Sequence, residues 1–327
     1  MSSKLERAWY SGAKWPLLLS PLEALFCSVA AYQKKQALKA QWLSPVPLII
    51  VGNINVGGTG KSPMVIHLIG LLRELGYRPG VGSRGYGSKA PQYPFSVEPS
   101  SSSDEAGDEP LMIVQRTGVP FVIDPDRPQA CRKLLESSDC NIIISDDGLQ
   151  HYAMGRDIEI AVIDSRRGLG NGHCLPVGPL REKADRLSEV DFVVVNGHGG
   201  FTIPGAQHMV LKNDQWLTVK ERVPVNPDDW QGSAVHAVAG IGRPERFYET
   251  LRAEGLTVIE HSFADHHHYT VEDISFNDQL PVIMTEKDAV KCRHLLLPSH
   301  YFYLTVKVEM ADSFKEQLQQ RLVNLVK

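Results

Sequence analysis

Residues 47–62 read PLIIVGNINVGGTGKS, and this stretch decides the fold. Its apolar start predicts a buried strand, and Gly-Lys-Ser at 60–62 predicts a helix that begins after a glycine-rich turn. Glycines let the backbone come close to a phosphate, and successive N–H groups at a helix start converge on phosphate oxygens. The stretch therefore predicts a P-loop. The residues expected to bind nucleotide phosphates are Asn55, Gly57, Gly58, Thr59, Gly60, Lys61 and Ser62.

Two side chains of this loop have expected roles. Lys61 is expected to reach the β- and γ-phosphates, and Ser62 is expected to offer its hydroxyl to Mg²⁺. The strict pattern has a glycine five residues before Gly60, where this chain has Asn55. Asparagine tolerates left-handed backbone better than most residues, so we expect the loop to keep its shape. The alternative is an ordinary glycine-rich turn between a strand and a helix.

Alternating strands and helices predict the fold class. Strands are expected at 141–145, 158–164 and 191–195, and a helix is expected at 63–76 directly after the loop. This alternation is typical of an α/β fold with a mostly parallel sheet, here of the P-loop NTPase type. A second, smaller α/β domain is expected from about residue 233, after a strand-rich linker.

Composition narrows the class of protein. The chain has 327 residues, of which 43% are hydrophobic and 22% charged, as expected for a globular protein with a full core. The net charge of −4 argues against nucleic acid as a partner. The five cysteines are scattered without paired metal spacing, which favours a reducing compartment and no disulfide framework.

The first 46 residues carry six basic side chains against two acidic ones, around an apolar stretch at 15–33. Pro16, Pro21 and Glu23 interrupt that stretch, so we expect no membrane-spanning helix. Leu22, Leu25, Phe26 and Val29 share one helical face, which suits a helix lying in a membrane interface. An amphipathic helix packed on its own domain fits these residues equally well.

These observations predict five segments. They are a membrane-interface helical segment at 1–46, a P-loop domain at 47–200, a strand-rich linker at 201–232, a smaller α/β domain at 233–298, and a returning strand with a final helix at 299–327.

Polar residues follow several predicted strands, where parallel sheets place their sites. Asp146 and Asp147 directly follow a buried strand and are candidates for Mg²⁺ ligands, although a simple turn is the alternative. Arg84 and Tyr86 follow another strand and could contact a phosphate or stack on a ring, or lie in a solvated loop. Asp108 begins a predicted helix, where an aspartate is usually only a cap.

A run of histidines follows Asp265 at 266–268. It could bind a metal, although its spacing is unusual for helix-borne ligands, and a histidine beside an aspartate suits proton transfer better. A GTPase should carry an Asn-Lys-x-Asp motif after a strand, whereas residues 196–199 read NGHG. This departure weakens a GTPase interpretation.

Taken together, the motifs resemble one family, the tetraacyldisaccharide 4′-kinases of lipid A biosynthesis, over nearly the whole chain. The resemblance rests on nine segments in order: VGNINVGGTGKSP, SRGYG, AGDEPLMI, DDGLQH, YAMGRD, PVGPLRE, AGIGRPERF, FADHHHY and TEKDAVK. Two positions depart from the family pattern. Ser62 replaces a threonine but keeps the hydroxyl, and Leu149 replaces a phenylalanine.

The resemblance implies transfer of the ATP γ-phosphate to the 4′-hydroxyl of a tetraacylated glucosamine disaccharide 1-phosphate. It implies that Asp108 is the catalytic base and His266 its orienting partner, brought together by closure of the two domains. Further family site residues fall on Arg127, Gln150, His151 and Arg181, as candidates for substrate or phosphate contacts, and on Asp146, Asp147 and Glu182, as candidate metal ligands beside Ser62.

The resemblance also implies ATP and Mg²⁺ as cofactors and a peripheral location on the cytoplasmic face of the bacterial inner membrane. That location favours the interfacial interpretation of the N-terminal helix. The alternative function is a non-kinase P-loop ATPase or a metal chaperone with a histidine-rich segment.

Overall fold

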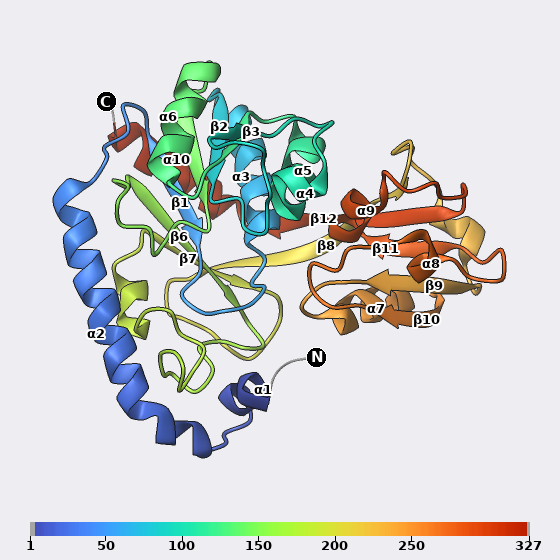
Figure 1. Ribbon diagram of the computed structural model, residues 1–327, viewed down its shortest axis with the longest axis horizontal. Helices are drawn as coiled ribbons and strands as arrows, with labels where there is room; N and C mark the ends of the chain where they lie inside the picture. Colours follow the sequence, from blue (N-terminus) through green and yellow to red (C-terminus); the bar gives the residue numbers. More distant parts are fainter. Residues whose placement is uncertain (1–3, 326–327) are drawn as a thin grey trace.

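The computed structural model describes residues 4–325, and within them twelve strands form one mixed, mostly parallel sheet (Figure 1). The strand order is β10-β9-β11-β12-β8-β7-β6-β1-β5-β2-β4-β3. The strands are β1 (Leu48–Gly52), β2 (Pro79–Ser83), β3 (Phe95–Ser96), β4 (Phe121–Ile123), β5 (Ile142–Asp146), β6 (Ile158–Asp164), β7 (Phe192–Asn196), β8 (Gln207–Thr218), β9 (Ala234–Ala239), β10 (Thr257–Ser262), β11 (Val282–Thr285) and β12 (Tyr301–Met310).

Helices cover the sheet and confirm the α/β class. They are α1 (Lys4–Tyr10), α2 (Ser20–Ala37), α3 (Lys61–Glu74), α4 (Ser103–Ala106), α5 (Asp108–Thr117), α6 (Arg127–Ser137), α7 (Pro244–Ala253), α8 (Val271–Ile274), α9 (Glu286–Cys292) and α10 (Asp312–Asn324), with short 3₁₀ turns at Trp15–Leu19, Leu38–Ala40, Ala184–Ser188 and Pro227–Trp230. The expected end of the final helix, Val326, lies outside the described residues.

The first lobe contains the β1 strand and its parallel neighbours β2, β4, β5, β6 and β7. Every residue of β1 is buried, because side chains of a central strand alternate between two covered faces. Ile49 and Val51 pack in one core with α3, α5 and α10, whereas Leu48 and Ile50 pack in another with α6. The apolar run of the P-loop stretch is therefore a doubly covered strand.

The second lobe contains β9, β10 and β11 with α7, α8 and α9, and it stands to one side of the first (Figure 1). It has cores of its own, in which β9, β11 and the ends of β8 and β12 pack with these helices. The chain passes between the lobes along the antiparallel pair β8 and β12. One twelve-residue strand thus occupies much of the expected linker at 201–232.

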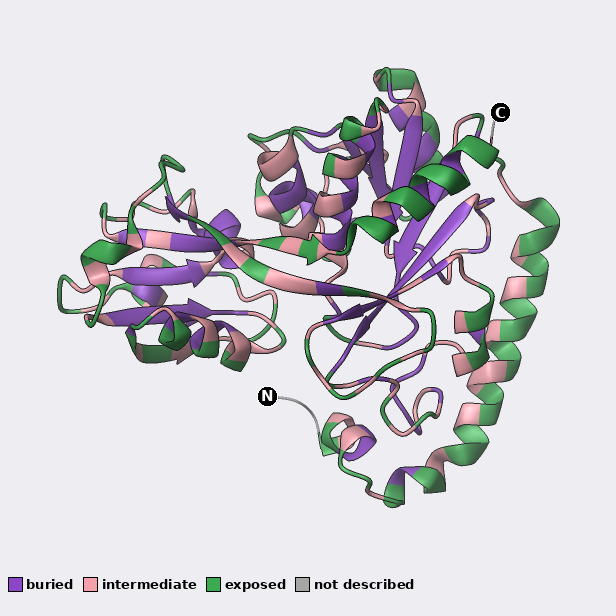
Figure 2. Ribbon diagram, turned by 180° about the vertical axis from the view of Figure 1, so that it is seen from behind, coloured by how far each residue is buried: buried purple, intermediate pink, exposed green. Residues whose placement is uncertain are grey.

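A helical segment over Trp15–Ala40 runs along the outer edge of the first lobe and is mostly exposed (Figure 2). It is 26 residues long, and an 18-residue window within it has a mean hydropathy of 1.3, so by length and composition alone it could cross a membrane. Pro16 and Pro21 lie in first turns, where a missing N–H costs little, so they do not interrupt the helical segment as expected.

The two sides of α2 differ in what they contact. Phe26 packs against the first-lobe core, and Glu23 accepts a hydrogen bond from the Cys174 backbone N–H at 2.6 Å. Leu22, Leu25 and Val29 are exposed instead, with exposed fractions of 53%, 60% and 45%. Three of the four residues expected to share an apolar face are therefore exposed, whereas Phe26 packs against its own domain.

Candidate active site

The loop between β1 and α3 has the backbone that a P-loop requires. Gly57 and Gly60 have φ values of 106° and 97°, which residues other than glycine rarely adopt. A Cβ atom on Gly60 would also clash with the side-chain amide of Asn196, which donates a hydrogen bond to the Thr59 carbonyl at 2.9 Å. The end of β7 thus supports the end of the loop.

Asn55 does not use the left-handed backbone that asparagine tolerates. Among the described non-glycine residues, positive φ occurs at Asp147, Arg222 and His266. The Asn55 amide instead donates a hydrogen bond to the Gly168 carbonyl at 2.9 Å, and the side chain is buried. Asn55 therefore fastens the P-loop to the segment after β6.

The Lys61 and Ser62 side chains both contact carboxylates. The Lys61 ammonium lies 3.4 Å from Asp147 Oδ1 and donates to Asn53 Oδ1 at 3.3 Å. The Ser62 hydroxyl donates to Glu109 Oε2 at 2.9 Å. Both side chains that the sequence singles out therefore lie in one charged cluster at the start of α3.

Asp146 and Asp147 end β5 beside this cluster. Burial, followed by the charges of Glu109 and Asp147, raises the pKa of Asp146 to about 7. Burial alone would also raise the pKa of Asp147, but Lys61, Arg181 and Arg127 outweigh it and hold that pKa below its usual value. The two adjacent carboxylates thus have opposite electrostatic environments.

The cluster has the chemistry that a Mg²⁺ ion prefers. Asp146 Oδ1 is buried and has no hydrogen-bond partner among the described residues, although buried polar atoms are nearly always paired. Its neighbour Glu109 accepts the only proton of Ser62, which leaves the lone pairs of the hydroxyl oxygen for a cation. Carboxylate and hydroxyl oxygens suit this ion.

The remaining family candidates surround Asp147. Arg127 is buried and donates to the Asp147 backbone carbonyl at 2.6 Å, and Arg181 lies 3.3 Å from the Asp147 carboxylate. Burial, together with the charge of Arg127, lowers the pKa of His151 to about 4. His151 is therefore neutral at pH 7.

Gln150 and Glu182 form a connected pair on the side facing α2. Gln150 Nε2 donates to the Asn53 carbonyl at 3.1 Å and to Glu182 Oε2 at 3.0 Å. Glu182 also accepts a hydrogen bond from the Tyr152 hydroxyl. These contacts direct the Glu182 carboxylate toward Tyr152 and Gln150, whereas Glu109 is the carboxylate that contacts Ser62.

Asp108 and His266 meet across the two lobes. Gly107, with φ of 84°, turns the chain into α5 so that Asp108 stands at its first position. The His266 Nδ1 and Asp108 Oδ2 atoms lie 3.0 Å apart. Burial would raise the pKa of Asp108, but the hydrogen bond from His266 and the charges of Lys291 and Lys287 lower it. Asp108 is therefore ionised at neutral pH.

Two further candidates, Arg84 and Tyr86, follow β2. The Tyr86 ring lies 5.7 Å from the His266 ring between centroids and is 76% exposed. Arg84, two residues earlier, is exposed at the end of β2. Tyr86 thus borders His266, whereas the charge of Arg84 acts on Arg127 and His151.

The other two histidines of the run have separate partners. His267 Nε2 lies 3.1 Å from Asp273, and His268 Nδ1 lies 3.2 Å from Asp104. Within residues 4–325, no three or more histidine, cysteine, aspartate and glutamate side chains are arranged to hold a metal ion. The histidine run therefore offers no common ligand position.

Sequence reasoning missed an ionic contact between the lobes. Arg243 and Arg246 both pair with Asp164 Oδ2, at 2.5 and 2.8 Å, and Arg243 also donates to the Gly58 carbonyl at 3.1 Å. Asp164 ends β6 and is buried, with its side chain 1% exposed. A strand-end aspartate and an arginine in the AGIGRPERF segment were the available signals, but neither indicated the partner.

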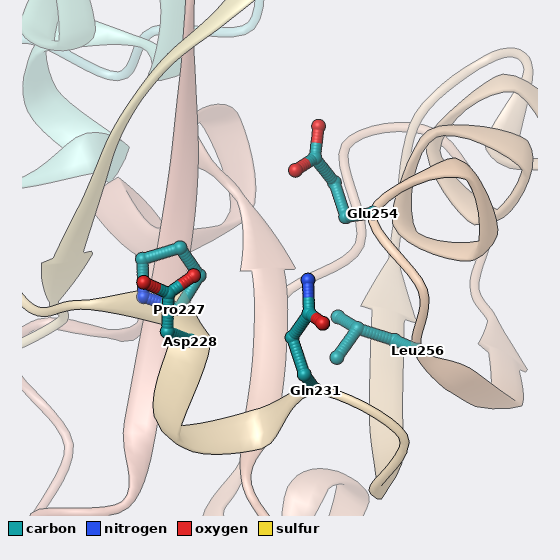
Figure 3. Close-up of a pocket in the computed structure, with 5 residues that line it drawn as sticks. All are labelled: Pro227, Asp228, Gln231, Glu254 and Leu256. Atoms are coloured by element: carbon teal, nitrogen blue, oxygen red, sulfur yellow. The ribbon is translucent and has the colours of Figure 1, made fainter.

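A small cavity in the second lobe lies among other residues. Figure 3 shows it between Pro227, Asp228, Gln231, Glu254 and Leu256. Its volume of about 30 Å³ is enough for a water molecule and too small for a nucleotide or a sugar. This cavity is therefore not a nucleotide site.

Comparisons with known proteins agree over the whole chain. The family model described as tetraacyldisaccharide-1-P 4′-kinase matches residues 15–323. Proteins named tetraacyldisaccharide 4′-kinase from Azotobacter vinelandii and Pseudomonas fluorescens Pf0-1 are 46% and 48% identical, over 100% of this chain and 98% of theirs. A crystal structure of "apo" form LpxK from Aquifex aeolicus in complex with ATP has a TM-score of 0.80 at 26% identity, covering 94% of this chain and 99% of that one. This chain belongs to the tetraacyldisaccharide-1-P 4′-kinase family.

Proposed function

We propose that this chain transfers the γ-phosphate of ATP to the 4′-hydroxyl of a tetraacylated glucosamine disaccharide 1-phosphate. Its family supports an ATP-dependent kinase, and the match along the whole chain removes support for a non-kinase ATPase or a metal chaperone. The single observation that carries the assignment to this site is the Asp108–His266 contact, which joins the two lobes next to the P-loop. A base and a phosphate-binding loop then lie where the two lobes meet.

The P-loop would bind and orient the phosphates. Phosphoryl transfer needs alignment and charge neutralisation more than covalent chemistry by the protein. Gly57 and Gly60 allow the backbone N–H groups to approach phosphate oxygens, and Lys61 supplies a cation that must exchange Asp147 for the β- and γ-phosphates. Arg127, Arg181, Gln150, His151, Arg84 and Tyr86 remain candidates for contacts with the phosphates or the sugar.

Ser62 and Asp146 are the residues that would hold Mg²⁺, and Asp147 and Glu182 remain further candidates. When bound, the ion would neutralise charge on the phosphates and fix their geometry. Asp146 has a buried oxygen without a partner among the described residues, and a divalent cation would favour its ionised form. The ion would thereby relieve the unfavourable environment of this carboxylate.

Asp108 would accept the proton of the sugar hydroxyl, and His266 would orient it. The lowered pKa of Asp108 keeps it ionised at neutral pH, so it is ready to accept a hydrogen bond from the substrate. It is a weak base, which suits a loose transition state in which the hydroxyl loses its proton late. His266 comes from the second lobe, so the pair forms only where the lobes meet.

We also propose that α2 lies on the cytoplasmic face of the bacterial inner membrane. Leu22, Leu25 and Val29 form an exposed apolar stripe, while Glu23 and Phe26 attach the adjacent side of the helix to the first lobe. A helix held to the protein in this way fits the membrane surface rather than a path through it. The acylated substrate could then reach the site while its chains stay in the bilayer.

The test is phosphorylation of the lipid itself. Purified protein, γ-labelled ATP, Mg²⁺ and the tetraacylated disaccharide 1-phosphate should yield label on the disaccharide. Lys61→Ala should reduce this rate by about 10²-fold or more, because a cation that binds the transferring phosphate is lost. ATP consumption without label on the lipid would contradict the proposal.

A further inference from the structure

Glu109 stands beside Asp108 in the first turn of α5, and it also contacts the second lobe. Asp108 meets His266, and Glu109 Oε1 lies 3.2 Å from the Lys287 ammonium. Lys287 lies in the first turn of α9, and its ammonium is also 3.3 Å from Asp265, the residue before His266. Two neighbouring residues of the first lobe thus have two neighbouring sets of partners in the second.

The two oxygens of Glu109 have different partners. Oε1 accepts from Lys287 at 3.2 Å, and Oε2 accepts from the Ser62 hydroxyl at 2.9 Å. Burial would lower the pKa of Lys287, but Glu109, Asp265 and Asp108 outweigh it and raise that pKa, so the ammonium is charged. One carboxylate therefore links a second-lobe cation to the P-loop hydroxyl.

The direction of the Ser62 hydroxyl depends on this link. A serine hydroxyl has one proton, and donating it to Glu109 leaves the oxygen lone pairs for another partner. Glu109 also lies near enough to Asp146 to raise the pKa of that carboxyl, so the two carboxylates repel each other when both are ionised. Lys287 offsets this repulsion from the Glu109 side, at a side chain that is only 16% exposed.

We propose that Lys287 is a positioning residue: it holds Glu109, and Glu109 directs the Ser62 hydroxyl toward the Mg²⁺ that accompanies ATP. The inference rests on the proposed function, and specifically on its nucleotide site. It adds a second task for the second lobe, because that lobe supplies the partner of Asp108 and also prepares the metal ligand on the P-loop. Nucleotide binding should then depend on Lys287 only when Mg²⁺ is present.

The experiment measures binding of a non-hydrolysable ATP analogue by calorimetry, once with Mg²⁺ and once with EDTA. Lys287→Met should weaken binding with Mg²⁺ by about 10-fold or more, as is typical when the residue that orients a metal ligand is removed. In EDTA its affinity should stay within about 3-fold of wild type, since Ser62 then has no ion to bind. Lys287→Arg should retain most of the Mg²⁺-dependent affinity.

Two further variants separate this role from others. Once Glu109→Ala has removed the carboxylate that contacts Ser62, Lys287 keeps only Asp265 and no longer acts on the hydroxyl, so the double variant should bind no more weakly than Glu109→Ala alone. Lys315→Met, which removes a more exposed lysine paired with Glu74 away from the site, should bind normally in both conditions. Melting curves verify the fold, and Lys287→Gln provides a second neutral side chain if the methionine variant unfolds.

Three results would overturn the inference. They are unchanged binding by Lys287→Met, an equal loss with Mg²⁺ and with EDTA, and losses that multiply in the double variant. An equal loss would mean that Lys287 contacts the phosphates directly. Failure of the proposed function looks different, since the wild-type protein would then bind the analogue with Mg²⁺ but leave the lipid unphosphorylated.

Discussion

Asp108 and His266 are 158 positions apart in the chain, and a 3.0 Å contact makes them one unit. Replacing either residue by alanine should lower kcat by about 10²-fold or more with a modest change in KM. The double variant should be little worse than the worse single variant, because residues that act together lose their effect together. Steady-state kinetics on the three variants measures this. Losses that multiply would show two independent roles.

Asp146 should make stability depend on pH when no cation is present. Its pKa is raised to about 7, so the folded state keeps a proton that the unfolded state releases above its lower pKa. Its contribution to stability is therefore most favourable at acidic pH and is lost as pH rises toward about 7. Asp146→Asn should raise the melting temperature at pH 8 by at least about 2 °C, and much less at pH 5.

Adding Mg²⁺ provides the control for this prediction. Adding Mg²⁺ with an ATP analogue should stabilise the wild-type protein at pH 8 more than it stabilises the Asp146→Asn variant, because the ion favours the ionised carboxylate. Thermal melts at the two pH values provide all four comparisons. A wild-type protein that is more stable than the variant at pH 8 without Mg²⁺ would contradict the prediction.

Local sequence was sufficient for some site residues and not for others. Glycines, Lys61 and Ser62 follow a strand directly, so their place could be predicted from nearby residues. The contact between Asp108 and His266 was expected only through the family resemblance, and the structure confirms that they meet. Lys287 and Arg243 have partners far away in the chain, which depend on how the lobes pack, and local patterns carry no information about that packing.

At the scale of elements, α2 carries exposed apolar residues next to one that packs against the core. Leu22→Glu with Leu25→Glu places charges on the exposed stripe, and it should abolish binding to anionic vesicles without lowering the melting temperature much. Phe26→Glu is the matched variant one turn after Leu22, on the side that faces the first lobe, and it should lower the melting temperature because Phe26 packs against the core. Vesicle co-sedimentation and melting curves measure the two effects. Unchanged vesicle binding by the double variant would contradict an interfacial role.

Basic residues are expected to add an electrostatic contribution to vesicle binding. Lys35 and Lys39 are exposed on α2 and its continuation, so their reversal to glutamate should weaken vesicle binding in a salt-dependent way. Lys34 is less suitable for this test because its ammonium lies 4.5 Å from the centre of the Tyr152 ring and pairs with Glu189.

Strands and helices of the first lobe were mostly predicted correctly, since apolar periodicity is local. Exposure of the α2 stripe was not predictable, because periodicity does not say what covers a face.

At the scale of the whole molecule, Asp164 connects the lobes through Arg243 and Arg246. Asp164→Asn should leave two arginines close together without their carboxylate and destabilise the fold by about 3 kcal/mol. It should also broaden the distribution of distances between spin labels placed on the two lobes. Glu260→Gln breaks the exposed pair with Arg252 inside the second lobe and should change neither quantity. A normal distance distribution for Asp164→Asn would show that other contacts keep the lobes together.

We propose that the five expected segments correspond to units of the chain, with the second lobe inserted between β8 and β12. In the sequence, the strand-rich stretch at 201–232 and the second α/β pattern that follows it indicated this insertion. The sequence did not indicate that all twelve strands form one sheet, because β8 and β12 pair although they are far apart in the sequence.

The return of the chain along β12 into α10 has a consequence for synthesis. Phe314, Leu318 and Leu322 of α10 are buried in the same core as β1 and α3, although they are translated after the entire second lobe. A ribosome therefore releases a complete second lobe before it has released the residues that finish the first. Until those residues emerge, one apolar side of the nucleotide-binding half stays open, so the part made earliest is the part that matures last.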